Sequence, residues 1–269
     1  MSIRKILLLA VCLIGVNTLY AGDVVRVKGA VGRWEVSDDI TPKQAEEKAL
    51  FEAKKEALRK AGVMENVWSV FGQVSATHGD EFFEAYSSVS AIAIDGKVNI
   101  IDKKVEDLWD QNLHRDYKIV TIDAYVTKDE VMEDKTYVMS VEGIEPLYKE
   151  NEFMRFTVKV HGADSYLKVF WFGEGGAGLI FPTPEVAGNE NRLFKADVEY
   201  QFPLPSPDLY LIGKADPAVD VEKVNVIIVA TKKDYLFDIK EPDYQSIIQW
   251  VYNIPADERT LFHTLTLIK

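Results

Sequence analysis

The chain has 269 residues, of which 47% are hydrophobic and 28% are charged. That balance is typical of a folded protein and excludes the disordered and fibrous classes, and the length suits about two domains that each bury a core. The formal net charge of −12 argues against binding to nucleic acid or to anionic lipid, because both rely on an excess of Lys and Arg.

The start of the chain has the pattern of an export signal. Arg4 and Lys5 form a positive segment, an apolar run follows over 6–16, and Ala21 before Gly22 fits a cleavage site. The apolar run is shorter than the about 20 residues that a membrane-spanning helix needs, and charges interrupt every later apolar run. We therefore predict cleavage between Ala21 and Gly22 and a periplasmic or extracellular product without a transmembrane span.

Cys12 is the only cysteine in the chain and raises the alternative of a lipid anchor. It lies in the middle of the apolar run, and Val11 stands where a lipidation motif normally has a small residue, so we expect no anchor at Cys12. Removal of the leader takes Arg4 and Lys5 with it and leaves 29 basic against 43 acidic residues, a net charge of −14. The exported chain would then have neither a disulfide nor a thiol nucleophile.

The clearest element of the first half is an amphipathic helix that follows Thr41. Thr41 is a good N-cap, Gln44 at the third helical position completes a capping box, and Gly62 offers a C-terminal stop. Alanines on one face of this helix predict close packing against a sheet. The other elements expected in this half are strands over 24–37, 92–101 and 117–126, the last two antiparallel, and a shorter helix over 79–88.

The second half has a different composition, with many prolines and several strand-like runs. The expected elements are strands over 153–160, 166–172, 224–231 and 260–268, and one late helix over 242–254 with Pro242 at its first position. A charged segment over 128–135 marks the expected domain boundary.

These elements predict an α+β fold. The expected order is a leader over 1–21, an α+β domain over 22–134 in which a helix packs on a small antiparallel sheet, and a β-rich, sandwich-like domain over 135–269 with one late helix.

A glycine-rich motif in the second half raises the question of a cofactor site. Residues 173–178 fit G-x-G-x-x-G, and Asp197 follows at about the distance of a ribose ligand in dinucleotide-binding folds. Such a loop must open a helix, whereas these glycines lead into an apolar run that ends at Pro182 and Pro184. The motif therefore predicts a β-hairpin and no cofactor.

Three consecutive aromatic residues, Phe170, Trp171 and Phe172, precede this hairpin. Side chains alternate between the two faces of a strand, so at least one ring must lie outside the core that the other rings share. We expect the late helix over 242–254 to cover that second face. The alternative is an exposed patch that binds a ligand or a protein.

Reagents for catalysis or metal binding are sparse in this sequence. Four histidines, at positions 78, 114, 161 and 263, stand apart from one another without metal-ligand spacing, so no metal site is predicted. No G-x-S-x-G motif marks a serine nucleophile. A carboxylate pair of the kind that hydrolyses glycans stays open, because 43 acidic residues offer many combinations.

Two resemblances to bacterial families follow from short motifs. The second half contains the motifs Asp164-Ser165-Tyr166-Leu167-Lys168-Val169-Phe170, Gly178-Leu179-Ile180-Phe181-Pro182, Asn191 and Ile227-Ile228-Val229-Ala230-Thr231. Over about residues 140–260 it resembles an uncharacterised bacterial domain of unknown function, which implies a β-rich fold and no reaction. The stretch from Gly29 to Val63, with a Trp-containing strand and an Ala-rich helix that ends Ala61-Gly62-Val63, is similar to the N-terminal domain of flagellar assembly protein T and related envelope lipoproteins.

Both relatives are envelope accessory proteins without known catalysis. Together with the export signal, they indicate a non-catalytic binding or assembly module of the cell envelope whose partners are other envelope proteins. The alternative is a hydrolase of an envelope polymer or glycan that uses a carboxylate pair. The sequence does not indicate an oligomeric state.

Overall fold

The computed structural model describes residues 23–37, 40–63, 66–128, 132–182, 192–204, 212–214 and 218–269. The fold is α+β with a late helix near the C-terminus, as the sequence predicts. The helices are α2 (Pro42–Ala61), α3 (Asn66–Asp95), α4 (Tyr244–Tyr252) and the short 3-10 helix η2 (Ala256–Glu258). The strands are β1 (Val24–Val36), β2 (Val98–Asp110), β3 (Arg115–Thr127), β4 (Met139–Glu142), β5 (Leu147–Tyr148), β6 (Phe156–Val160), β7 (Tyr166–Gly173), β8 (Gly176–Phe181), β9 (Glu199–Phe202), β10 (Glu222–Thr231) and β11 (Arg259–Ile268).

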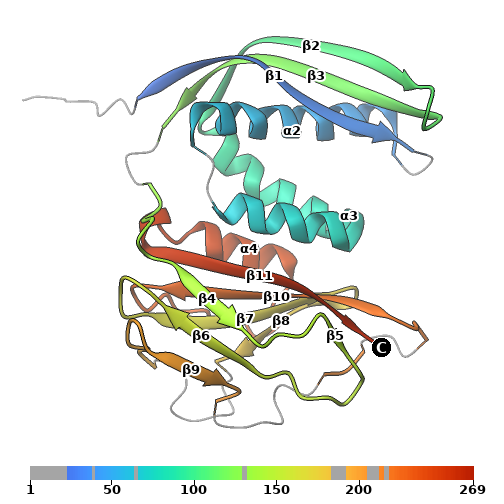
Figure 1. Ribbon diagram of the computed structural model, residues 1–269. Helices are drawn as coiled ribbons and strands as arrows, with labels where there is room; N and C mark the ends of the chain where they lie inside the picture. Colours follow the sequence, from blue (N-terminus) through green and yellow to red (C-terminus); the bar gives the residue numbers. More distant parts are fainter. Residues whose placement is uncertain are drawn as a thin grey trace, which may run out of the picture.

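The first half forms an antiparallel sheet of order β1-β3-β2 with α2 on one face (Figure 1). Helix α2 begins and ends as predicted, with a complete capping box at Thr41 and Gly62 in the left-handed region at φ 75°. The predicted close packing is also present, because a Cβ on Gly32 of β1 would lie 1.9 Å from the carbonyl oxygen of Ala49. Small residues therefore let the helix backbone touch the sheet.

Helix α3 corrects two expectations. It runs over Asn66–Asp95, whereas the sequence suggested a helix over 79–88 and a strand from 92, and β2 begins only at Val98. The alternation of isoleucines that suggested a strand from 92 belongs to the end of a helix, where Ile92 is exposed and Ile94 is buried. Strand β2 also continues to Asp110, through a charged stretch beyond the predicted end at residue 101.

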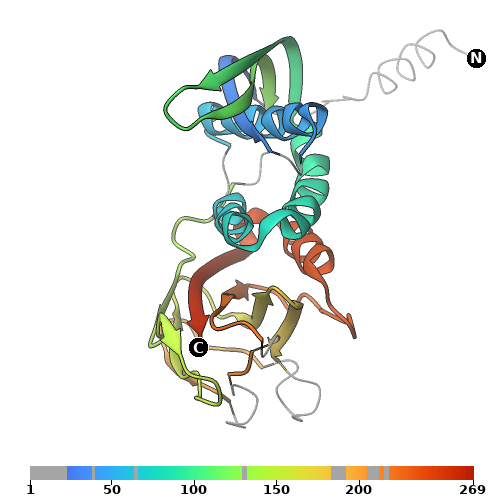
Figure 2. The same ribbon diagram turned by 90° about the vertical axis from the view of Figure 1, so that its right-hand side faces the viewer.

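Helix α3 folds back on itself rather than running straight (Figure 2). In a straight helix Phe71 and Tyr86 would lie about 22 Å apart along the axis. Their ring centroids are 6.5 Å apart, and those of Phe71 and Phe82 are 6.4 Å apart. The bend lies between Phe71 and Phe82, an interval that contains Gly79, and glycine is a frequent site of helix kinks.

The second half contains a five-stranded sheet of order β5-β11-β10-β7-β8 and a three-stranded sheet of order β4-β6-β9. The two sheets share a core, to which β10 contributes Val226 and Ile228. The other face of β10, with Ile227 and Val229, joins the core that contains α3 and α4. The large sheet is thus covered on both faces.

The aromatic run in β7 follows this division. Phe170 and Phe172 lie in the core with α3 and α4, while Trp171 packs against the core between the two sheets. The prediction that the late helix covers the second face is confirmed, and the Phe170 and Trp250 rings are 5.7 Å apart. Helix α4 is capped by Asp243, so Pro242 precedes the cap instead of occupying the first helical position.

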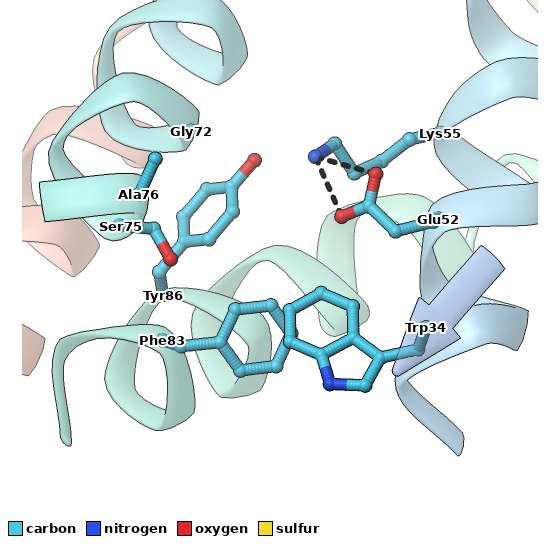
Figure 3. A pocket seen from close by; sticks show the side chains of 8 residues that line it. All are labelled: Trp34, Glu52, Lys55, Gly72, Ser75, Ala76, Phe83 and Tyr86. Carbon is cyan, nitrogen blue, oxygen red and sulfur yellow. Dashed lines mark hydrogen bonds and ion pairs between the residues drawn. The ribbon is translucent and has the colours of Figure 1, made fainter. Parts of the chain in front are cut away.

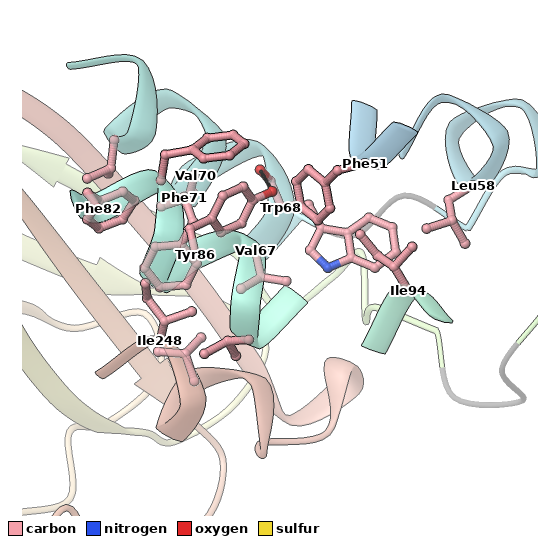
Figure 4. Close-up of a cluster of buried hydrophobic side chains, with 14 of the residues drawn as sticks. Phe51, Leu58, Val67, Trp68, Val70, Phe71, Phe82, Tyr86, Ile94 and Ile248 are labelled. Atoms are coloured by element: carbon pink, nitrogen blue, oxygen red, sulfur yellow. Dashed lines mark hydrogen bonds between the residues drawn. The ribbon is translucent and has the colours of Figure 1, made fainter. Parts of the chain in front are cut away.

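The layers follow one another from the β1-β3-β2 sheet through α2, α3 and α4 to the two sheets of the second half (Figure 1). Aromatic and aliphatic side chains of α2, α3 and α4 form one continuous core (Figure 4). The division into 22–134 and 135–269 stays a prediction. Within the described residues, no helix is long and apolar enough to cross a membrane.

Candidate binding cleft between α2 and α3

The glycine-rich motif forms a β-hairpin, as predicted. Strands β7 and β8 pair antiparallel with Gly173 opposite Gly176, whose φ is 128°. Gly178 lies opposite Trp171, and a Cβ on Gly178 would be 2.2 Å from the indole nitrogen. Asp197 is in a loop and lies 2.6 Å from Nδ1 of His161. The motif therefore makes room for the Trp171 side chain and does not open a helix.

The histidines have separate surroundings. Besides the His161 pair with Asp197, Nε2 of His263 lies 2.5 Å from Oδ1 of Asn225, and His114 is in the β2–β3 turn. The side chain of His78 lies outside the described residues. Among the residues described, no three His, Cys, Asp or Glu side chains gather in a way that could hold a metal ion.

Two hollows lie between α2 and the bent α3, the first against both arms of α3 and the second against its later arm, and together we call them the α2–α3 cleft. The first has a volume of about 380 Å³ and is lined by Trp34, Glu52, Lys55, Gly72, Ser75, Ala76, Phe83 and Tyr86 (Figure 3). The second has a volume of about 430 Å³ and is lined by Gln44, Glu47, Lys48, Leu50, Phe51, Lys54, Phe83, Glu84, Ser87, Ser88, Ala91 and Asp95. Both volumes fall in the range of ligand pockets.

Aromatic rings separate the two hollows. Phe83 lines both, and its ring centroid is 4.7 Å from that of Trp34 and 6.0 Å from that of Phe51. Phe51 also meets the ring of Tyr86 edge to face at 5.8 Å. Phe83, Phe51 and Tyr86 are buried, so this wall is a fixed part of the core.

Lysine side chains from α2 lie over these rings. Nζ of Lys48 is 4.6 Å from the Phe83 ring centroid, and Nζ of Lys55 is 5.6 Å from that of Tyr86. Lys55 also donates to both carboxylate oxygens of Glu52, at 3.0 and 3.2 Å. Cations over ring faces in a partly buried site are attracted by the ring quadrupoles. The cleft thus presents apolar surface edged with charges of both signs.

Tyr86 is a titratable group in the wall of the first hollow. Burial raises the pKa of Tyr86 far above its usual value, so its hydroxyl stays protonated at neutral pH. Elsewhere in the described part of the chain, carboxyls with shifted pKa values have them lowered by ion pairs or hydrogen bonds, as for Glu56, Asp110 and Glu258.

The sequence does not single out the cleft residues. Trp34 lies within the strand predicted over 24–37, and Phe83 and Tyr86 lie within the helix predicted over 79–88. The spacing of the buried residues Phe82, Tyr86 and Val89 does give one face of a helix, but the return of α3 towards α2 depends on tertiary contacts.

The expected leader and its cleavage residues, Ala21 and Gly22, lie outside the described residues, as does Cys12. In comparisons with known proteins, no family model, no curated protein and no solved structure matches this chain. The two resemblances drawn from sequence motifs stay predictions.

Proposed function

We propose that this chain is an exported accessory protein of the cell envelope that works as a non-catalytic binding or assembly module, and that it holds its partner in the α2–α3 cleft. The observation that supports this proposal is the pair of hollows around Phe83, where aromatic walls meet lysine and carboxylate side chains. Concave apolar sites with a few polar groups are where proteins bind ligands and peptide segments.

The partner should offer apolar side chains flanked by polar or charged groups. Apolar groups would replace water at the rings of Trp34 and Phe83. Basic groups would meet Glu47 and Glu84 of the second hollow, in keeping with the strongly acidic chain. Other proteins of the envelope are the partners that an exported module of this kind would meet.

Two filling substitutions test the cleft. Ser88 is exposed and lines the second hollow, and Ala76 is exposed and lines the first. Ser88→Trp and Ala76→Trp should each reduce the set of envelope proteins that the immobilised chain retains from an envelope extract, as quantified by mass spectrometry. The matched control is Ser69→Trp, because Ser69 is an exposed serine of α3 that lines neither hollow.

Equal retention by the wild type and all three variants would contradict the cleft as the binding site. A hydrolase of an envelope polymer is the alternative function. It would be favoured by a measurable hydrolytic rate on isolated envelope polymers that disappears when one pair of acidic residues is changed.

Export is tested separately by the intact mass of the protein recovered from the periplasm or medium. The expected mass is that of a chain beginning at Gly22. A lipidated product beginning at Cys12 that is lost in Cys12→Ser would contradict the proposed cleavage site.

A further inference from the structure

Strand β2 is an exposed edge of the β1-β3-β2 sheet. It has 13 residues and pairs with β3 along one side, and no strand in the described part of the chain pairs with its other side (Figure 1). Residues from Ile101 to Trp109 are all exposed, including the large side chains of these two residues at 46% and 51%. An open edge with free backbone donors and acceptors pairs readily with another strand.

The charges along this edge have an antisymmetric order about Val105. Lys103 and Lys104 precede Val105, and Glu106 and Asp107 follow it. If a second copy of β2 runs antiparallel with the two Val105 residues opposite each other, Lys104 of each copy faces Glu106 of the other. Lys103 of each copy likewise faces Asp107 of the other.

We propose that this edge pairs with the same edge of a second copy of the chain, giving a two-fold symmetric dimer with a continuous six-stranded antiparallel sheet centred on Val105. Opposite charges would then face each other at four positions. Ile101 lies at the bulge of β2 between Ile100 and Asp102, so the regularly paired segment runs from Asp102 to Leu108 of each copy.

The charge order also selects this register over its neighbours. Residues that lie directly opposite each other in a strand pair have their side chains on the same face of the sheet. The two-fold axis must therefore pass between two copies of the same residue, and the neighbouring registers are those centred on Lys104 and on Glu106. A centre at Lys104 places that lysine opposite its own copy, and a centre at Glu106 does the same with two carboxylates. Like charges opposite each other destabilise a strand pair.

The ionic groups of β2 have partners within one copy that a cross-strand pair would share or replace. Lys103 lies 2.8 Å from Glu46 of α2, and Asp107 pairs with Lys118 of β3. Side chains of Lys104, Glu106 and Asp107 are 67%, 50% and 77% exposed. Within one copy, Lys104 lies 2.8 Å from Glu106 on the same strand, an exposed ion pair that is easily exchanged for a cross-strand one.

The opposite edge of the sheet lacks this charge order. Both edge strands carry a bulge, β1 between Val27 and Ala30 and β2 between Ile100 and Asp102, so the bulges do not distinguish them. Three of the four charged residues of β1 are basic, and unbalanced charge is a common device that keeps an edge from pairing. Dimer formation is therefore assigned to the part of β2 that follows its bulge, from Asp102 onwards.

Charge exchange at one pair of positions tests the proposal. The wild type should sediment as a dimer in analytical ultracentrifugation. Lys104→Glu and Glu106→Lys each place like charges at two facing positions and should each raise the dimer dissociation constant about tenfold or more. An equimolar mixture of the two variants should recover a dimer, because opposite charges face each other again.

The matched control is Lys43→Glu on α2, which changes the net charge as Lys104→Glu does at a side chain that is 87% exposed. This variant should remain dimeric. Recovery in the mixture also shows that both single variants are folded. A monomeric wild type, or a dimer that neither variant weakens, would overturn the proposal.

The register is tested by cross-linking in a Cys12→Ser background. Val105→Cys should form an intermolecular disulfide on mild oxidation, because Cβ atoms of directly opposite residues are about 5 Å apart. Leu108→Cys should not, because Leu108 faces Asp102 and its own copy lies six residues away. Cross-linking of Leu108→Cys at the same rate as Val105→Cys would contradict this register.

Discussion

Strands β10 and β2 are both long, but β10 is almost entirely buried and β2 is almost entirely exposed. Nine of the ten residues of β10 are buried, because α3 and α4 cover one face of its sheet and β4, β6 and β9 cover the other. One of the 13 residues of β2 is fully buried, and α2 covers its sheet on a single face, mainly over β1 and β3. The apolar run of β10 and the charged stretch of β2 match these environments. The pattern of apolar and charged residues along each strand thus indicates how many of its faces are buried.

Truncation of buried side chains should give the largest difference in unfolding free energy between the two strands. Ile227 and Ile228 are fully buried on opposite faces of β10. Ile227→Ala and Ile228→Ala should each lower the free energy of unfolding by about 2–5 kcal/mol, through lost burial and the cavity that remains. Urea denaturation gives both values.

The matched change on β2 is Val105→Ala, measured at a concentration low enough to keep the chain monomeric. Its expected effect is within about 0.5 kcal/mol, since Val105 is exposed on the open edge. A loss at Val105 as large as that at Ile228 would show that the edge of β2 is covered by other parts of the monomer.

The next effect concerns the contact between α2 and its sheet. Gly32→Ala places a methyl group against the backbone of Ala49 and Ala53 and should lower the free energy of unfolding by about 1–3 kcal/mol. Gly213→Ala is the control, because Gly213 has no atom within 4 Å of an added Cβ. Equal stability of the two variants in thermal unfolding would contradict the close approach of α2.

The β7–β8 hairpin gives a comparable prediction. Gly178→Ala must displace the Trp171 indole, and Gly176→Ala must accept a φ of 128°, so both should lower stability by about 1–3 kcal/mol. Neither variant should change a nucleotide affinity. Saturable binding of NAD or ATP by the wild type that Gly176→Ala abolishes would contradict the hairpin interpretation.

Local signals in the sequence predicted the parts of the fold that depend on local physics. The cap at Thr41, the stop at Gly62 and the apolar run of β10 each act over a few residues, and each is found where expected. Helix α3 was predicted too short because its interior contains Gly72 and Gly79, which lower helix propensity, while burial against α4 compensates for that cost.

The candidate cleft could not be predicted from local sequence patterns, because it depends on contacts between residues that are far apart in the chain. Trp34 and Phe83 are 49 positions apart, and only the bend of α3 brings their rings to 4.7 Å. The packing of α3 against α4 across the expected domain boundary could not be predicted either, because no sequence pattern in one helix identifies the other as its packing partner.

The smallest expected effect lies at the link between the two halves. Asp134 precedes β4, and its carboxylate accepts hydrogen bonds from Nζ of Lys232 at 2.7 Å and from the Thr136 hydroxyl and backbone N–H. The Lys232 ammonium and these hydrogen bonds hold the pKa of Asp134 well below its usual value.

A folded-state pKa below the unfolded value means that the ionised form stabilises the fold. This contribution is fully present above the unfolded pKa of about 4 and is lost as the pH falls from there towards the lower folded value. Asp134→Asn should therefore flatten the decline of unfolding free energy between pH 5 and pH 3, values about one unit on either side of that pKa. Lys232→Met should flatten it only in part, because the hydrogen bonds from Thr136 remain. The double variant should lose no more than Asp134→Asn alone, because that substitution already removes the ion pair with Lys232. Additive losses in this cycle would show that Asp134 and Lys232 stabilise the link through separate partners.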